Sequence, residues 1–214
     1  MIMNCHNNPK CAQDSNLAGI LVIGGSSSSA YQSVEFWSAA DPEQGSCILN
    51  DYPRKMESGP TANLVSGRLV ACSELSCQVY QEGSWEHLVN TTDRRRYHSS
   101  ATTEDGVLLI GGMFSDTTEW ISVDGSAPQP GPFALLNGPR HCTIQLSASI
   151  IVVTGGYPGE NYVTQYHLAD GTETPLTPLG QPRHDHACGV YQDADDQQVR
   201  KHFYNCSILG FNFS

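Results

Sequence analysis

Residues 97–112 read Y-H-S-S-A-T-T-E-D-G-V-L-L-I-G-G. The stretch predicts two short strands joined at Asp105-Gly106, because Asp-Gly between strand-like segments is a strong signal for a tight turn with positive φ. The second strand is the aliphatic run 107–110, and a short apolar run bounded by glycine is more typical of a buried strand than of a helix. The glycine pair that follows allows another backbone to come close, or backbone angles that other residues avoid.

The same unit recurs along the chain. Aliphatic runs that end on paired glycines occur at 21–25 and 150–156, and residues 69–73 form a similar run without the glycines. The residues taken as equivalent are Gly24, Ala71, Gly111 and Gly155. They are separated by 47, 40 and 44 residues along the chain.

Two further landmarks share this period. An arginine shortly precedes or directly adjoins each of His98, His141 and His184, and these histidines are 43 and 43 residues apart. A turn with glycine recurs later in each unit, at 41–45, 82–83, 124–125 and 170–171. A fixed period of about 40 to 50 residues indicates a repeat architecture.

Each unit is predicted to contain four strands. The third strands are alternating and rich in aromatic residues, at 33–37, 76–80, 118–123 and 162–168. The fourth strands of the later units contain Pro130, Pro132, Pro175 and Pro178. Because proline removes a donor from the ladder, these strands are predicted at the outer edge of each sheet. Four-stranded sheets repeated at this period indicate the blades of a β-propeller.

The pattern of an apolar run, a double glycine, an aromatic strand and an outer-strand tryptophan (Trp85) resembles kelch repeats over residues 18–199. The cysteines Cys47, Cys72 and Cys77 make it more similar to the secreted, cysteine-bearing kelch proteins of invertebrates than to intracellular adaptors. The resemblance implies an all-β, kelch-type β-propeller of about four complete four-stranded blades plus part of a fifth. The expected blades are 18–56, 57–92, 93–137, 138–180 and a partial 181–199.

Both ends of the chain lie outside this pattern. Residues 1–17 are expected to be a lead-in without strands, and residues 200–214 a divergent tail. Kelch rings commonly have six or seven blades, so the sequence predicts an incomplete ring and suggests a truncated product. An open arc would expose edge strands, which predicts self-association through them.

Composition excludes some classes of partner. The 214 residues carry a net charge of −11, which argues against nucleic acid. No apolar run approaches the roughly 18 residues that span a bilayer, so no membrane insertion is expected, and the start does not read as a signal peptide. The one basic cluster, residues 94–96, is interpreted as a solvated turn, with a contact patch for an acidic partner as the alternative.

Eight cysteines are many for this length. Cys72 and Cys77 are predicted on neighbouring strands of one blade, within reach of a disulfide, with Cys47 as a competing partner. Cys142 and Cys188 fall at near-equivalent places in adjacent blades and are candidates for a second bridge. Buried thiols in a cytoplasmic protein are the alternative. Cysteine count and sequons, Asn90-Thr91-Thr92 foremost, favour an extracellular glycoprotein.

Two further hypotheses assign a chemical function to the chain: a metal site and a copper-dependent active site. His98, His141 and His184-Asp185-His186 could converge on a metal, but as repeat positions they are better explained by hydrogen bonds to turn backbone. Some kelch-type propellers, the galactose oxidase relatives, bind copper through tyrosine, histidine and a Tyr-Cys crosslink. The candidates for such a site here are Cys142, Tyr157, Tyr191, His141 and His186. No matched catalytic motif supports them, so neither catalytic residues nor a cofactor is expected.

The remaining prediction is a binding module. Propellers place variable loops on one face of a rigid scaffold. The loops after the glycine pairs expose Met113-Phe114 and Tyr157-Pro158, the candidate contacts for a protein or glycan partner. The alternatives are a fragment of a galactose-oxidase-like copper enzyme and an intracellular kelch substrate adaptor for a ubiquitin ligase; such adaptors carry N-terminal helical domains that nothing here resembles.

Overall fold

A computed structural model describes residues 19–23, 32–38, 46–53, 61–135 and 138–189. Within these residues the regular elements are all strands. In chain order they are β1 (Gly19–Ile23), β2 (Val34–Ser38), β3 (Ser46–Leu49), β4 (Thr61–Val65), β5 (Arg68–Cys72), β6 (Ser76–Gln81), β7 (Ser84–Asn90), β8 (Ser99–Thr102), β9 (Gly106–Ile110), β10 (Thr117–Ser122), β11 (Gln129–Ala134), β12 (Cys142–Ser147), β13 (Ile150–Thr154), β14 (Val163–His167) and β15 (Glu173–Pro175).

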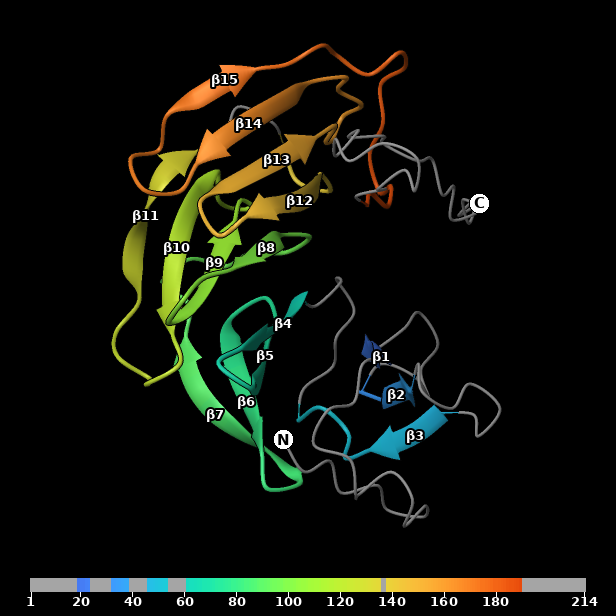
Figure 1. The fold of residues 1–214 in the computed structure, drawn as a ribbon, viewed down its shortest axis with the longest axis vertical. Coiled ribbons are helices and arrows are strands. Elements are labelled where there is room, and N and C mark those ends of the chain that lie inside the picture. Colours follow the sequence, from blue (N-terminus) through green and yellow to red (C-terminus); the bar gives the residue numbers. More distant parts are fainter. Residues whose placement is uncertain (1–18, 24–31, 39–45, 54–60, 136–137, 190–214) are drawn as a thin grey trace.

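The strands form four antiparallel meanders in a β-propeller arrangement (Figure 1). Blade 1 has three described strands, β1 to β3, and blades 2, 3 and 4 have four each, β4 to β7, β8 to β11 and β12 to β15. The first strands of the three complete blades lie innermost and contact one another, while β7, β11 and β15 lie on the outside of the arc. The all-β fold and the propeller arrangement expected from the repeats are therefore confirmed.

Apolar side chains are buried between neighbouring blades rather than within one. Val34 and Phe36 of blade 1 pack with Leu69 and Tyr80 of blade 2. The next cluster joins the buried residues of blade 2 to those of blade 3, including the aliphatic run of β9. The third joins blades 3 and 4, where Phe133 stacks on Tyr166 with ring centroids 4.2 Å apart. Each repeat thus depends on its neighbour to remove its apolar surface from water.

The Asp105-Gly106 turn is present, but for a different reason than expected. Positive φ is found in other hairpins, at Ser66-Gly67 and Glu82-Gly83, and Gly106 does not adopt it. A Cβ at Gly106 would lie 2.0 Å from the carbonyl oxygen of Ile121. The glycine is required because the backbone of β10 lies against it.

The glycine pairs after β9 and β13 take angles that disfavour other residues. Gly111 has φ of 58° and Gly155 has φ of 63°. The amide of each donates to a carbonyl at or just before the next strand, to Thr117 at 3.0 Å and to Tyr162 at 2.9 Å respectively. In blade 2 the amide that makes this bond belongs to Ser73, which donates to Ser76. The equivalence assigned to Ala71 is wrong, because Ala71 lies within β5.

The connections between blades also repeat. Tyr97, Arg140 and Asp185 all have positive φ, and their backbones form a chain in which Arg140 N–H donates to Tyr97 and Asp185 N–H donates to Arg140. The histidine after each is therefore the equivalent residue, so the third member is His186 and not His184. The insertion of two residues before His186 hid this in the sequence.

Three of the four predicted edge prolines are confirmed, since Pro130 and Pro132 lie in β11 and Pro175 in β15, the outermost strands of their sheets; Pro178 lies beyond the end of β15 and in no strand. The fifth unit differs from its prediction. Where a strand was expected from His184, residues 181–189 form only isolated bridges, one of them between Arg183 and Glu160. The rest of this unit, like residues 1–17 and 200–214, lies outside the described residues.

Candidate functional site

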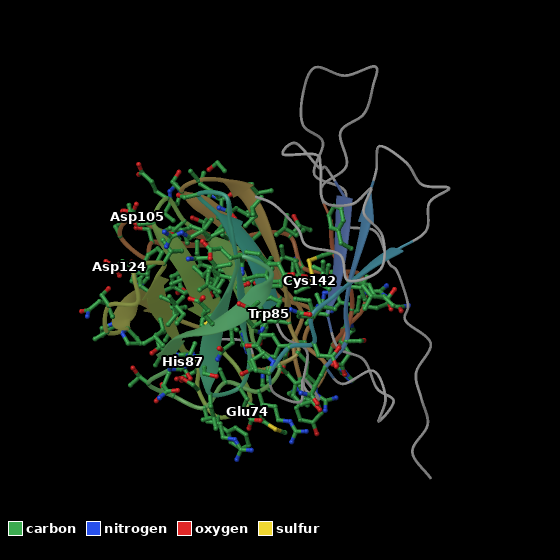
Figure 2. All side chains as sticks on the ribbon, turned by 90° about the horizontal axis from the view of Figure 1, so that it is seen from below. Glu74, Trp85, His87, Asp105, Asp124 and Cys142 are labelled. Carbon is green, nitrogen blue, oxygen red and sulfur yellow. A yellow bond between two sulfur atoms is a disulfide. The ribbon has the colours of Figure 1, made fainter. Side chains whose placement is uncertain are left out.

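The two ends of the blades differ in structure. At one end, the crossover face, lie the loops from second to third strands and the connections from each outer strand to the next inner strand. At the other end, the hairpin face, lie the tight turns, many of them acidic. Figure 2 shows Asp105 and Asp124, which belong to hairpin turns, at the end opposite Glu74 of the crossover face.

The four predicted contact residues lie on the crossover face. Met113 and Phe114 are 45% and 55% exposed, and Tyr157 is 50% exposed. Pro158 is also exposed and follows a cis peptide bond. Apolar side chains of this size, left in water on adjacent loops, are the usual anchors of a protein contact.

Arginines join these loops into one surface. The Arg140 guanidinium lies over the ring of Tyr97, with Cζ 4.4 Å from the centroid, and 5.7 Å from the centroid of Tyr157. Arg96 contacts the same Tyr97 ring at 5.3 Å, and Arg94 lies 4.8 Å from the centroid of Phe114. We call this set the arginine–aromatic ladder: Arg94, Arg96, Tyr97, Phe114, Arg140 and Tyr157.

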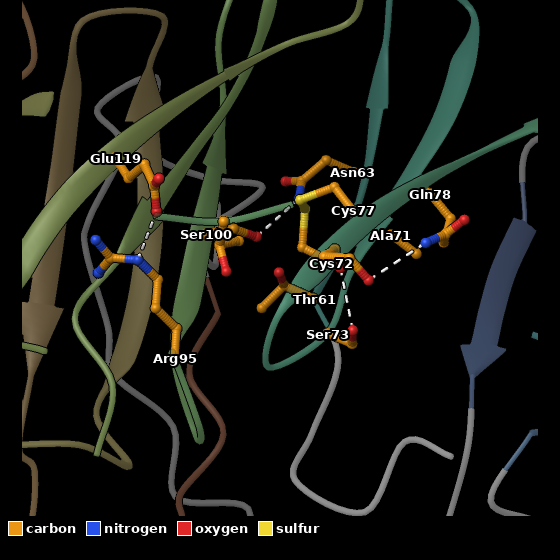
Figure 3. The surroundings of a disulfide bond; sticks show 12 residues. Thr61, Asn63, Ala71, Cys72, Ser73, Cys77, Gln78, Arg95, Ser100 and Glu119 are labelled. Atoms are coloured by element: carbon orange, nitrogen blue, oxygen red, sulfur yellow. Dashed lines mark hydrogen bonds and ion pairs between the residues drawn. A yellow bond between two sulfur atoms is a disulfide. The ribbon is translucent and has the colours of Figure 1, made fainter. Parts of the chain in front are cut away.

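The basic cluster at 94–96 is not one solvated turn. Arg94 is exposed and pairs with Glu74, and Arg96 is half-buried over Tyr97. Arg95 is 1% exposed and pairs with Glu119, which is 3% exposed. Arg95 also donates to the carbonyls of Gly111 and Thr117 and to the Thr117 hydroxyl. Its role is to fix the crossover to blade 3 (Figure 3).

The charges of the ladder arginines are largely matched within the chain. Besides the Arg94–Glu74 pair, Arg140 donates to Asp185 at 2.8 Å. Asp185 also contacts His184, whose ring lies edge-on to Tyr157 with centroids 5.7 Å apart. Two of the three arginines in the 94–96 cluster, Arg94 and Arg95, are thus neutralised by carboxylates, which weakens the alternative prediction of a basic patch for an acidic partner.

A cavity of about 420 Å³ opens beside the ladder, where the crossover of Arg95 passes the outer strands of blade 3. Its polar wall holds Asp93, Arg95 and Glu119, and its apolar wall comes from β11. The lining residues are Thr92, Asp93, Arg95, Thr117, Thr118, Glu119, Pro130, Gly131, Pro132, Phe133 and Ala134. Ser115, which follows Phe114, donates to Asp93 at 2.8 Å and so connects the cavity to the ladder.

The repeat histidines are buried between blades and act as neutral hydrogen-bonding groups. His98 donates from Nδ1 to the Arg95 carbonyl and accepts at Nε2 from the Thr61 hydroxyl of the preceding blade. His141 is held in the same way by the Gly138 carbonyl and Ser99. Burial lowers the pKa of each of these two imidazoles to about 4, because the cation would lose its hydration.

The third histidine follows the same pattern in part. His186 Nε2 lies 2.8 Å from the Thr154 hydroxyl, and burial lowers its pKa as well. Among the described residues, no three histidine, cysteine or acidic side chains are grouped as metal ligands would be. The hydrogen-bonding role proposed for the repeat histidines fits these contacts.

Both predicted disulfide pairings within the described residues are present. Cys72 and Cys77 are bonded across β5 and β6, so Cys72 does not bond its predicted competitor Cys47 (Figure 3). Cys142 and Cys188 are bonded over 46 residues of sequence and fasten residues 182–189 to β12. This bond takes the sulfur that a Tyr-Cys crosslink at Cys142 would need. Tyr191, another member of that predicted copper set, lies outside the described residues.

Asn90, the predicted glycosylation residue, ends β7 and is exposed. The sequence did not reveal the ladder residues Tyr97 and Arg140, the buried Arg95–Glu119 pair, or the cavity. For Tyr97 and Arg140, the only signal in the sequence was their place in the repeated Arg-Tyr-His and Pro-Arg-His motifs.

No protein-family model matches the sequence, and no curated protein matches it either. The propeller arrangement therefore stands on the structure alone. In the described part of the chain, no helix has the length and apolar character needed to cross a membrane.

Proposed function

We propose that this chain is a non-catalytic interaction module of the kelch type that binds a protein partner on its crossover face. The observation that carries the proposal is the arginine–aromatic ladder, which joins the exposed loops of blades 3 and 4 into one rigid surface. Aromatic and arginine side chains are enriched at the energetic centres of protein interfaces.

Rigidity supports this proposal. Phe114 and Tyr157 are held by cation–π contacts with arginines that are themselves paired to carboxylates. Exposed aromatic side chains that are already ordered lose little conformational entropy when a partner covers them. The scaffold beneath them is stiffened by the buried Arg95–Glu119 pair.

An extracellular location completes the proposal. The bonds Cys72–Cys77 and Cys142–Cys188 are of a kind that persists in oxidising compartments and is rare where glutathione keeps thiols reduced. The exposed Asn90 would then be available as a glycan acceptor.

The test compares capture by matched surface variants. The disulfide-bonded protein is immobilised and incubated with extracellular fractions, and crosslinked proteins are quantified for wild type, the double variant Phe114→Ala/Tyr157→Ala, and Leu64→Ala. Leu64 is 60% exposed but lies on β4, away from the ladder loops, so it controls for loss of exposed apolar surface. We expect a protein bound by wild type and the control to be lost with the double variant. Capture that is equal for all three, or a glycan-only ligand, would contradict the proposal.

A further inference from the structure

We infer that the cavity beside the ladder is an anchor site for an arginine or lysine side chain of the protein partner, an inference that deepens the proposed function and rests on it. The cavity of about 420 Å³ lies within the range of roughly 300–1,000 Å³ typical of binding pockets. The cavity lies beside Phe114, because the next residue, Ser115, donates a hydrogen bond to Asp93 in the cavity wall.

The charge of the lining selects a cation. Two carboxylates, those of Asp93 and Glu119, face one guanidinium, that of Arg95. Arg95 donates from Nε to Oε2 of Glu119 at 2.9 Å. The distance from its NH2 nitrogen to Oδ2 of Asp93 is 3.6 Å, which is beyond ordinary hydrogen-bonding distance. The carboxylate of Asp93 is also 45% exposed, so it is the charge that an incoming group meets.

The remaining polar groups of the cavity are already occupied. Glu119 accepts from the Thr92 amide as well as from Nε of Arg95, and three further N–H groups of Arg95 donate to Gly111 and Thr117. The Thr118 hydroxyl donates to the Phe133 carbonyl. The fifth N–H group, on NH2, lies beside the Asp93 carboxylate at 3.6 Å, so an anion would meet that negative charge, whereas a cation is attracted to it.

The apolar wall suits the rest of such a side chain. Pro130, Pro132 and Phe133 line the side of the cavity formed by β11. Lysine and arginine carry a hydrocarbon stem that packs on apolar surface while the charged end contacts a carboxylate.

The net negative charge of the whole chain also favours a positively charged ligand. The net charge is −11, and Arg94, Arg95 and Arg140 of the crossover face are paired with carboxylates of the chain itself. A segment with positive charge would be attracted at long range and then held at Asp93. This choice of a basic partner replaces the acidic partner considered from residues 94–96.

The experiment titrates a blocked Gly-Gly-Arg-Gly-Gly peptide, and its lysine and citrulline counterparts, into isotopically labelled full-length protein at low salt. Amide shifts are followed by nuclear magnetic resonance. We expect the arginine and lysine peptides to shift the amides of Thr92, Asp93 and Gly131. Citrulline has the shape of arginine without its charge, and we expect it to bind about tenfold more weakly.

Variants localise the effect. Asp93→Asn keeps the size and the acceptor for Ser115 and should weaken the arginine peptide about tenfold, whereas the exposed neighbour Asp116→Asn should change affinity by less than about twofold. Ala134→Trp fills the cavity from an exposed position and should abolish the shifts. Equal binding of arginine and citrulline peptides, an unchanged affinity for Asp93→Asn, or shifts confined to other residues would overturn the inference.

The peptide assay is independent of the natural partner. Phe114→Ala removes a ladder contact but no lining residue, so it should leave peptide affinity unchanged while reducing partner capture. A failed peptide titration with intact partner capture would reject the anchor site alone. Peptide binding without ladder-dependent capture would reject the proposed function.

Discussion

The guanidinium of Arg95 donates from Nε to Oε2 of Glu119 at 2.9 Å, with both side chains removed from water. Arg95 lies in the connection between blades 2 and 3, and Glu119 lies on the third strand of blade 3. The pair therefore ties the polypeptide that enters blade 3 to the interior of that blade. The same connection carries Arg94, Arg96 and Asp93, so the pair positions both the ladder and the cavity.

Breaking this pair should destabilise the fold strongly. Glu119→Gln removes the negative charge and leaves the guanidinium of Arg95 buried, which typically costs about 3 to 5 kcal/mol. Urea denaturation followed by tryptophan fluorescence measures the loss. Glu104→Gln, at an exposed hairpin position, is the matched control and should change the free energy of unfolding by less than about 0.5 kcal/mol. Equal effects of the two substitutions would show that the pair is not buried.

The buried histidines make stability depend on pH. The pKa of His98 and of His141 is lowered to about 4 in the folded protein, against 6.5 for an ordinary imidazole. Between these values the unfolded chain binds more protons, so stability is complete above about pH 6.5 and falls as pH drops towards 4. Each histidine accounts for about 3 kcal/mol at most. Urea midpoints at several pH values should follow this slope.

A neutral replacement distinguishes these histidines from other titrating groups. The double variant His98→Gln/His141→Gln removes both imidazoles, so its stability should depend much less on pH between 4 and 6.5. A wild-type midpoint that stays constant from pH 7.5 to 5 would rule out buried neutral imidazoles at these positions.

The two disulfides should contribute unequally. In the chain-entropy model, closing the 46-residue separation of Cys142–Cys188 stabilises by about 4 kcal/mol, and closing the separation of 5 between Cys72 and Cys77 by about 2 kcal/mol. Thermal denaturation of Cys142→Ser/Cys188→Ser and of Cys72→Ser/Cys77→Ser compares them. A larger loss for the short bridge would mean that packing around Cys72 and Cys77, rather than loop closure, dominates.

Glycine is required at 155 more than at 67, although φ is positive at both. A Cβ at Gly155 would lie 2.4 Å from the carbonyl oxygen of Arg183, whereas a Cβ at Gly67 would meet nothing within 4 Å. Gly67→Ala should cost about 1 kcal/mol from backbone conformation alone, and Gly155→Ala substantially more. The difference between their urea midpoints measures the steric part. Equal urea midpoints for the two variants would show that the blade 4 loop does not lie close to the carbonyl group of residue 183.

The sequence predicted the strands and their grouping because both depend on local patterns. The aliphatic run at 107–110, the glycine pairs and the proline-bearing outer strands each follow from hydrogen bonding and burial along one short segment. The sequence named both disulfides as candidates, because Cys72 and Cys77 fall on strands that a single turn joins and Cys142 and Cys188 at near-equivalent repeat positions, but it left the pairing open, with Cys47 as a competitor for Cys72.

Other features depend on contacts between distant segments. The equivalence of His186 with His98 and His141 is set by the backbone chain through Tyr97, Arg140 and Asp185, which an insertion of two residues obscures in sequence. The burial of Arg95 could not be read from three consecutive arginines, because Glu119 lies 24 residues away. Blade 1 has three described strands where four were expected, and residues 181–189 form bridges instead of a strand.

The candidate contacts Met113, Phe114, Tyr157 and Pro158 were named from sequence because large apolar residues follow the glycine pairs. The contacts of Arg140 with Tyr97 and Tyr157 could not be predicted from sequence, because they join side chains from three separate segments of the chain. The cavity likewise combines a crossover with two strands.

The most direct test of the account is whether Arg140 lies between the rings of Tyr97 and Tyr157 in solution. We predict nuclear Overhauser contacts from the Arg140 side-chain methylenes to both rings, and from His141 to Ser99 of the preceding blade. These contacts place the loops of blades 3 and 4 on one face of a propeller. Contacts from Tyr157 to hairpin-turn residues such as Asp124, with none to Arg140, would contradict both the blade arrangement and the binding surface built on it.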